Sequence, residues 1–236
     1  MARAARAVAA TPAADLVVLP ELFLGGYVLE GLERLALTPG DSALDPLADA
    51  ARSAGTAVVV GAAERVDGGV ANSAFCLDRG GRPAGTYRKA HLFGAEREAF
   101  VAGAELAPIR VDGVALGVMV CFDVEFPEAA RTLTLRGAEM LVTISANMAP
   151  FADDHEAFVR ARALENERPH LYVNRTGSES GARFVGGSRA IDPDGAVVAE
   201  AGAEPAVLDV RLGPPGRRDE RTTYISQRRP SLYSRE

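Results

Sequence analysis

Short apolar runs alternate with segments of helical periodicity along most of the chain. Strand-like runs bounded by turn residues occur at 15–20, 57–61, 70–77, 114–120, 139–145 and 171–174. Helical patterns occupy 45–53, 127–136 and 153–167. In the last of these, Phe158, Ala161 and Leu164 form a single apolar stripe. This alternation predicts an α/β protein in which helices cover large mixed sheets.

Turn sequences and the two ends of the chain complete this organisation. A hairpin turn at 78–82 precedes a strand toward Tyr87, and a turn at 192–195 separates two more strands. Residues 207–210 are expected to form the last strand, and residues 1–12 the final turns of an amphipathic helix rather than a signal peptide. No linker or repeat divides residues 1–212, which we expect to form one domain. Residues 213–236, rich in arginine and proline, are expected to be either disordered or an arm that wraps a partner subunit.

Composition narrows the class of protein. The 236 residues are 47% hydrophobic and 25% charged, with a net charge of −6, so no basic surface for nucleic acid is expected. No apolar run approaches the roughly 20 residues needed to span a membrane. Only Cys76 and Cys121 are present, which indicates a reducing, cytoplasmic setting without disulfides. The three histidines lie far apart, with no Cys/His spacing for a metal, and no cofactor is expected.

Cys121 marks the abrupt end of the apolar run 114–120. A polar turn and the start of a helix follow, which places the thiol at a strand-to-helix elbow. Backbone N–H groups and the helix dipole favour negative charge at such a position, so we expect the pKa of Cys121 to be lowered. The sequence therefore predicts a cysteine nucleophile, whereas Cys76, in an alternating run, is predicted to be an inert buried thiol.

Two further apolar runs end in polar residues suited to the same chemistry. Glu21 follows the run 15–20, and Lys89 follows the strand that passes through Tyr87. Strand ends at one rim of a sheet commonly gather catalytic groups. In that arrangement Glu21 acts as general base and acid, and Lys89 with the Phe122 backbone N–H stabilises an oxyanion, while Cys121 forms a thioester. The alternatives are a structural Glu–Lys pair and a cysteine that serves as a small hydrophobe.

The order glutamate, lysine, cysteine with these surroundings resembles the nitrilase superfamily, the carbon–nitrogen hydrolases. The matching segments are Asp15-Leu-Val-Val-Leu-Pro-Glu-Leu-Phe-Leu-Gly-Gly-Tyr27, Tyr87-Arg-Lys-Ala-His-Leu-Phe93, Cys121-Phe-Asp-Val-Glu-Phe-Pro-Glu128, Arg160-Ala-Arg-Ala-Leu-Glu-Asn166 and Val173-Asn-Arg-Thr-Gly177. The resemblance implies a four-layer αββα sandwich and a Glu21–Lys89–Cys121 triad. It also implies that Glu96, followed by Phe100 and Gly103, is the additional active-site glutamate, a choice that composition alone leaves open between Glu96 and Glu98. Family members usually begin with a further strand and a long helix, and only 14 residues precede Asp15 here, so the usual first strand is expected to be absent.

The resemblance also informs the substrate. The segment after Cys121 and the segment 145–150 look like those of amidases that act on small carboxamides. Nitrilases usually carry tryptophan and glutamate after the cysteine, whereas this chain has Phe122 and Asp123 and no tryptophan. The residues expected to contact substrate are Asn147, Met148 and Glu125. Asn147 has a turn role as its alternative, and Glu165 is expected either to buttress the pocket or to lie on an exposed helix face.

Several alternatives remain open at the level of the sequence. An N-carbamoyl amino acid amidase or a nitrilase would use the same triad, and an inactive scaffold or binding homologue would keep only the fold. The resemblance further implies a homodimer or larger homo-oligomer acting on a small-molecule amide, with neither nucleic acid nor membrane as a partner.

Overall fold

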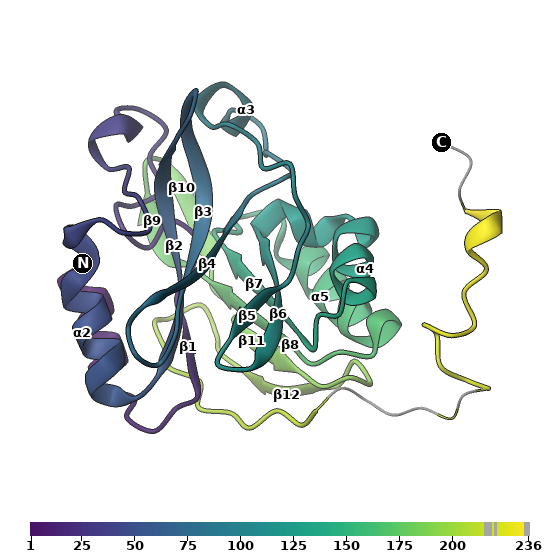
Figure 1. The fold of residues 1–236 in the computed structure, drawn as a ribbon. Helices are drawn as coiled ribbons and strands as arrows, with labels where there is room; N and C mark the ends of the chain where they lie inside the picture. Colours follow the sequence, from purple (N-terminus) through teal and green to yellow (C-terminus); the bar gives the residue numbers. More distant parts are fainter. Residues whose placement is uncertain (215–218, 220, 234–236) are drawn as a thin grey trace.

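Two sheets packed face to face lie between two layers of helices in the computed structural model, which describes residues 1–214, 219 and 221–233 (Figure 1). The first sheet has the order β1 (Leu16–Val18), β2 (Ala57–Val66), β3 (Gly69–Leu77), β4 (Pro83–Arg88). The second has the order β12 (Val197–Glu200), β11 (Arg189–Ile191), β8 (His170–Asn174), β7 (Met140–Ser145), β6 (Val114–Val120), β5 (Ile109–Val111). A separate hairpin consists of β9 (Thr176–Glu179) and β10 (Ala182–Val185).

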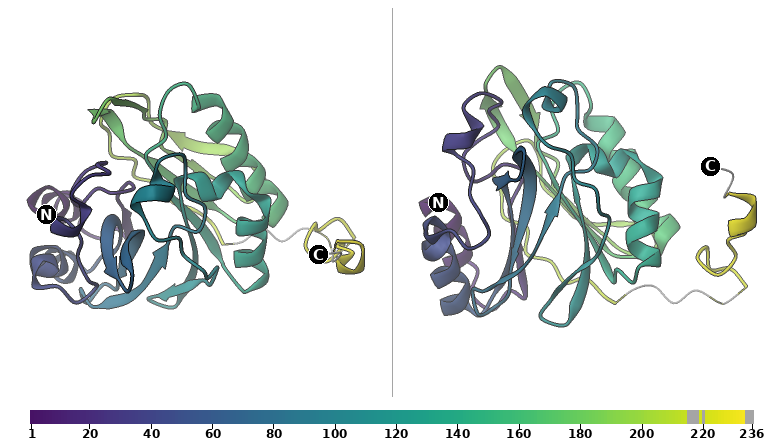
Figure 2. Two further views of the ribbon diagram at one scale, coloured as in Figure 1. Left: turned by 90° about the horizontal axis from the view of Figure 1, so that it is seen from above. Right: turned by 45° about the horizontal axis from the view of Figure 1, so that its top comes forward.

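Helices cover the outer face of each sheet, as the two further views show (Figure 2). The first sheet is covered by α1 (Ala2–Ala9) and α2 (Asp45–Ala54), and the second by α4 (Pro127–Leu135) and α5 (Ala152–Asn166). The short helical segments are η1 (Leu32–Arg34), η2 (Ser42–Leu44), α3 (Glu96–Ala99), η3 (Cys121–Glu125) and η4 (Pro230–Leu232). The expected αββα sandwich is therefore confirmed. Residues 1–15 contain α1 alone, and β1 lies at the edge of its sheet.

Strand alternation divides the apolar side chains of β2 between two cores. Val58 and Val60 pack against the buried faces of α1 and α2, whereas Val59 faces the second sheet. Val118 and Val120 of β6 belong to the same core cluster as Val59, in the space between the sheets. Because successive side chains of a strand point to opposite faces, a strand buried on both faces must be apolar throughout, which explains the unbroken valine runs.

Parallel pairing within the second sheet brings strand ends to one rim. β6 pairs with β7 and β7 with β8 in parallel, while β5, β11 and β12 join by antiparallel pairing. In the first sheet β1 pairs with β2 in parallel, and β2, β3 and β4 are antiparallel. As a result the residues that follow β1, β4 and β6 lie at the same end of the sandwich.

Two expectations about elements are wrong. Residues 207–210 form no strand, and Val207 is 76% exposed. In α5 the expected stripe of Phe158, Ala161 and Leu164 is only half-buried. The buried face carries His155, Val159, Arg162, Ala163 and Asn166. Polar residues occupy this face because their side chains form hydrogen bonds inside the protein. A pattern of apolar positions cannot predict such buried polar residues.

Candidate active site

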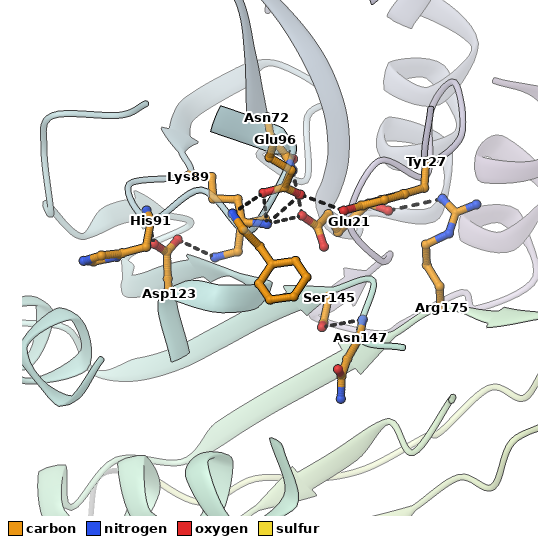
Figure 3. Close-up of polar contacts among 12 residues, drawn as sticks. Glu21, Tyr27, Asn72, Lys89, His91, Glu96, Asp123, Ser145, Asn147 and Arg175 are labelled. Atoms are coloured by element: carbon orange, nitrogen blue, oxygen red, sulfur yellow. Dashed lines mark hydrogen bonds and ion pairs between the residues drawn. The ribbon is translucent and has the colours of Figure 1, made fainter. Parts of the chain in front are cut away.

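Lys89 joins two buried carboxylates at the centre of the site. Its Nζ lies 2.8 Å from Glu21 Oε1 and 2.8 Å from Glu96 Oε2, and all three side chains are at most 1% exposed. Lys89 directly follows β4, and Glu96 starts α3 seven residues later. Tyr27 donates a hydrogen bond to Glu96 Oε1 at 3.0 Å (Figure 3), and the Phe93 N–H donates to Glu96 Oε2 at 2.9 Å. The predicted Glu21–Lys89 pair and the choice of Glu96 over Glu98 thus agree with the geometry.

Glu21 has one occupied and one free carboxylate oxygen. Oε1 accepts hydrogen bonds from Lys89 and from Asn72 Nδ2, the latter at 2.6 Å. Oε2 is buried and has no hydrogen-bond partner within the described residues. The Glu21 backbone can approach β2 closely because residue 61 is glycine, where a Cβ would lie 2.6 Å from the Glu21 Cα. An unpartnered buried carboxylate oxygen is poised to accept a proton.

A clamp formed by Arg175 holds the main chain of Glu21 from the opposite sheet. Arg175 follows β8, and its Nη1 donates to the backbone carbonyls of Glu21 and Leu22 at 3.3 and 2.9 Å. Its Nη2 lies 2.5 Å from Glu179 Oε2, which also accepts the backbone N–H of Tyr27 at 2.7 Å. The general-base candidate is therefore fixed through its main chain as well as its side chain.

The elbow at Cys121 is held in a left-handed backbone conformation, with φ of 46°. Such a conformation is strained for a residue with a Cβ and persists only when its surroundings enforce it. Asp123 supplies this support, since its carboxylate accepts the Val120 N–H at 3.0 Å, the Tyr87 hydroxyl at 2.8 Å and the His91 N–H at 2.9 Å. Buried Asp123 thus ties the turn at Cys121 to the strand ends around it.

The expected lowering of the Cys121 pKa is wrong. Burial, followed by the negative charge of Glu21, raises the pKa of this thiol, although Lys89 and Ser145 work in the opposite direction. The helix after Cys121 is the single turn η3, and α4 begins only at Pro127, so the expected dipole is short. The free site therefore holds a protonated thiol. Cys76, which is buried, has a pKa raised by burial to about 12 and fits the expected inert role.

Burial and neighbouring charges also shift the pKa values of Lys89, Glu96 and Tyr27. Burial acts to lower the pKa of Lys89, but Glu21, Cys121 and Glu96 outweigh it, so the pKa is well above its usual value and the ammonium stays charged. Burial, opposed by Lys89 and reinforced by Glu21, raises the pKa of Glu96. Burial and both carboxylates raise the pKa of Tyr27, which remains a neutral hydrogen-bond donor.

A single pocket contains most of the residues singled out in the sequence. It is lined by Lys89, Glu96, Cys121, Phe122, Glu125, Asn147 and Met148. The residues that the sequence did not single out are Tyr27, Phe93, Ala146, Phe151 and His155. Phe93, Phe122 and Phe151 make edge-to-face contacts and form an aromatic wall. Phe93 and Tyr27 stand within segments that carried the family resemblance, so those segments held a signal for them.

Three of the predicted pocket residues have internal partners as well. Asn147 Nδ2 donates to the Phe151 carbonyl at 3.0 Å, which fits its alternative role in a turn while leaving it in the pocket wall. Glu125 Oε1 lies 3.2 Å from His155 Nε2. Glu165 lies outside the pocket lining but pairs with Arg162, whose Nε and Nη2 donate to the carbonyls of Val124 and Glu125. The buttressing interpretation of Glu165 therefore fits the contacts.

Within the described part of the chain, no three His, Cys, Asp or Glu side chains are arranged to hold a metal ion. Among the same residues, no helix combines the length and apolarity required for crossing a membrane.

Comparisons with known proteins agree with this geometry. The model of the carbon–nitrogen hydrolase family matches residues 1–214. A hydrolase encoded in the pqqF 5′ region of Pseudomonas protegens is 41% identical, over 93% of this chain and 80% of its own length. An (R)-stereoselective amidase of a Pseudomonas species is 38% identical, over 80% of this chain and 70% of its own. A solved amidase of Nesterenkonia, with acrylamide added to its active-site cysteine, has a TM-score of 0.81 at 31% identity, covering 98% of this chain and 88% of that one.

Proposed function

Because the chain belongs to the carbon–nitrogen hydrolase family, we propose that it is an amidase that hydrolyses small carboxamides through a thioester on Cys121. The observation that carries this proposal is the convergence of three strand ends on one pocket. Lys89 and Cys121 both line this pocket, and Glu21 Oε1 lies 2.8 Å from Lys89 Nζ. The negative charge of Glu21, whose Oε2 has no hydrogen-bond partner among the described residues, acts on the Cys121 thiol. The relatives described above, which include an amidase with a reactive cysteine, support the same activity.

In the first half of the reaction, Glu21 takes the proton of Cys121 as the sulfur attacks the amide carbon. Negative charge then develops on the carbonyl oxygen. The charged Lys89 and the backbone N–H of Phe122 stabilise it, because the first N–H groups of a helical turn have no partner within that turn. Glu21 returns the proton to the nitrogen, the C–N bond breaks, ammonia leaves, and the acyl group remains on sulfur as a thioester.

In the second half, Glu21 removes a proton from water as the water oxygen attacks the thioester carbon. The tetrahedral intermediate collapses by breaking the C–S bond, and the proton held by Glu21 returns to sulfur, which releases a carboxylic acid and restores the thiol. Glu96 holds Lys89 in place throughout, since it contacts Nζ directly and is itself anchored by Tyr27 and the Phe93 N–H.

The charges around the pocket favour an uncharged acyl group. Lys89 is the only lysine or arginine among the described residues that line it, and two carboxylates already neutralise Lys89. Glu125 adds another carboxylate to the wall. A negative charge on the substrate would find no partner there, and burying an unpaired charge is costly. We therefore rank neutral carboxamides above N-carbamoyl amino acids. The aromatic wall, Asn147 and Met148 would contact the acyl group.

The decisive experiment measures ammonia release from a panel of neutral carboxamides, N-carbamoyl amino acids and nitriles. Cys121→Ala, checked for folding by circular dichroism, is the control. We expect release from neutral carboxamides that disappears in Cys121→Ala. Release that survives in the variant would remove Cys121 as nucleophile. A folded wild-type protein that releases ammonia from none of the three classes would favour an inactive homologue.

The setting of this activity is also part of the proposal. Both cysteines are free, which fits a reducing cytoplasm. We expect a homodimer or larger homo-oligomer in solution, to be measured by light scattering on the eluting protein. The domain boundary after residue 212 likewise stays a prediction. Regular strand structure ends at Glu200, and residues 221–233 meet the domain where Thr223 and the Tyr224 N–H contact Glu167.

A further inference from the structure

A chain of buried polar side chains runs behind the nucleophile and takes no part in the mechanism above. Glu125 Oε1 lies 3.2 Å from His155 Nε2, and His155 Nδ1 lies 2.9 Å from the Tyr172 hydroxyl. The Tyr172 hydroxyl donates to Ser145 Oγ at 3.2 Å. His155 and Tyr172 are each 3% exposed and Ser145 is fully buried, so the links from His155 to Ser145 are shielded from solvent. Glu125, at the far end, is 27% exposed and lines the pocket.

The chain ends beside Cys121. Strands β6 and β7 are parallel and pair Val120 with Ile144, so the next residues of each strand, Cys121 and Ser145, emerge side by side at the same rim. Burial and Glu21 raise the pKa of Cys121, while a hydrogen bond from Ser145 works against them by stabilising the sulfur anion. Of these four side chains, that of Ser145 is the one that reaches the Cys121 sulfur.

The donors and acceptors allow one consistent direction toward the sulfur. Ser145 Oγ accepts the Asn147 N–H at 3.1 Å and the Tyr172 hydroxyl, which leaves the serine proton free to point at Cys121. Since Tyr172 gives its proton to Ser145, its oxygen accepts from His155 Nδ1. On the other edge of the imidazole, His155 Nε2 lies 3.2 Å from Glu125 Oε1, which anchors the ring at the far end of the chain.

We propose that Glu125, His155, Tyr172 and Ser145 form a positioning chain in which His155 donates to Tyr172, Tyr172 to Ser145 and Ser145 toward Cys121, while Glu125 anchors the far edge of the imidazole. The Ser145 hydroxyl then supports the sulfur as it becomes an anion. No proton moves along the chain. With the Ser145 proton on one side of the sulfur, the thiol proton is directed to the free Oε2 of Glu21. This inference rests on the proposed role of Cys121 as nucleophile.

A double-mutant cycle of Ser145→Ala and Tyr172→Phe tests the proposal. Neither Ser145 nor Tyr172 lines the pocket, so kcat should fall while KM stays unchanged. Losing a hydrogen bond to a developing charge predicts a drop of about ten-fold or more for Ser145→Ala. Tyr172→Phe, which only removes polarisation of Ser145, should lower kcat by roughly two- to five-fold. If Tyr172 acts through Ser145, Tyr172→Phe has no further effect in the Ser145→Ala background.

A neighbouring buried hydroxyl supplies the matched control. Thr143 lies on β7 two residues before Ser145, and its Oγ1 is 2.8 Å from His170 Nε2, in a chain that leads away from Cys121. Thr143→Val should lower thermal stability without changing kcat. Equal losses of kcat in Thr143→Val and Tyr172→Phe would overturn the proposal, as would a Tyr172→Phe effect that persists in the Ser145→Ala background.

Alkylation of Cys121 by iodoacetamide, followed by mass spectrometry, separates this proposal from the proposed activity, because labelling needs no amide turnover. Ser145→Ala should slow labelling of Cys121 by about ten-fold at neutral pH. Wild-type labelling rates in Ser145→Ala would overturn the positioning chain even if the protein is an amidase. Slowed labelling in a protein that hydrolyses no amide would support the chain and count against the amidase assignment alone.

Discussion

At the scale of single residues, the proposed mechanism gives one carboxylate two opposite effects on Cys121. The negative charge of Glu21 raises the pKa of the thiol, and in the proposed mechanism the same carboxylate accepts the thiol proton. Lys89 lies between Glu21 and Glu96 and keeps its own positive charge for the oxyanion. Reactivity therefore depends on an amide entering the pocket rather than on a thiolate present beforehand.

Glu21→Gln should separate chemical reactivity from turnover. Without a general base, amide hydrolysis should fall by about a hundred-fold or more. The negative charge that raised the Cys121 pKa is also removed, so the thiolate should form at lower pH than in the wild type. The pH dependence of Cys121 alkylation measures this shift, with buried Cys76 as an internal control. A profile displaced to higher pH would contradict the assigned electrostatics.

Sequence reasoning identified Glu21, Lys89, Glu96 and Cys121 because each stands in a local pattern, a strand end or a family segment. It missed Asn72, which contacts Glu21 from 51 positions away. It also gave the wrong direction for the Cys121 pKa. A helix start is visible in sequence, whereas the burial of the thiol and the carboxylate that faces it are set by tertiary packing.

At the scale of elements, the strands were easier to predict than the faces of the helices. β2 and β6 carry apolar residues on both faces and stand out as runs, and α2 ends where Gly55 adopts a left-handed conformation, a common helix stop. In α5, by contrast, buried polar residues replace the apolar stripe. Each has a specific partner on another element, and no single-sequence periodicity encodes such a pairing.

His170, at the start of β8, makes stability depend on pH. Its Nδ1 donates to the Val159 carbonyl, and burial lowers its pKa to about 4. The unfolded chain binds this proton below a pH of about 6.5, so stability should fall as the pH drops from there toward 4. The full loss is on the order of 3 kcal/mol for this shift. Urea denaturation of wild type and His170→Gln at pH 7 and pH 4.5 checks it, and an equal pH dependence in both proteins would contradict the assignment.

At the scale of the whole molecule, the site is assembled across the space between the two sheets. Glu21 and Lys89 come from strand ends of the first sheet, and Cys121 and Ser145 come from those of the second. Arg175 links them, because it follows β8 yet holds the main chain around Glu21, 154 positions away. The order of the layers could be predicted from the alternation of apolar runs and helical segments and from the family resemblance. The contacts of Arg175 could not, because they form only when the two sheets pack against each other.

Arg175→Ala should therefore reduce activity through position rather than through chemistry. Losing both main-chain contacts frees Glu21, and we expect kcat to fall by roughly ten-fold, as expected when a catalytic group is displaced slightly. Arg183→Ala, an exposed arginine on the adjacent strand β10, is the matched control and should leave kcat unchanged. Steady-state kinetics with thermal melts would distinguish a displaced base from global unfolding. Unchanged kcat in a folded Arg175→Ala protein would contradict the claim that Arg175 positions Glu21.

The protonated state of Cys121 has a consequence for the lifetime of the protein. Hydrogen peroxide attacks thiolates and converts them to sulfenic acid, which higher doses oxidise irreversibly. A thiol whose pKa is raised by burial and by Glu21 offers peroxide little anion to attack. The carboxylate that delays the sulfur until an amide arrives thus also shields it from oxidation during the intervals without substrate.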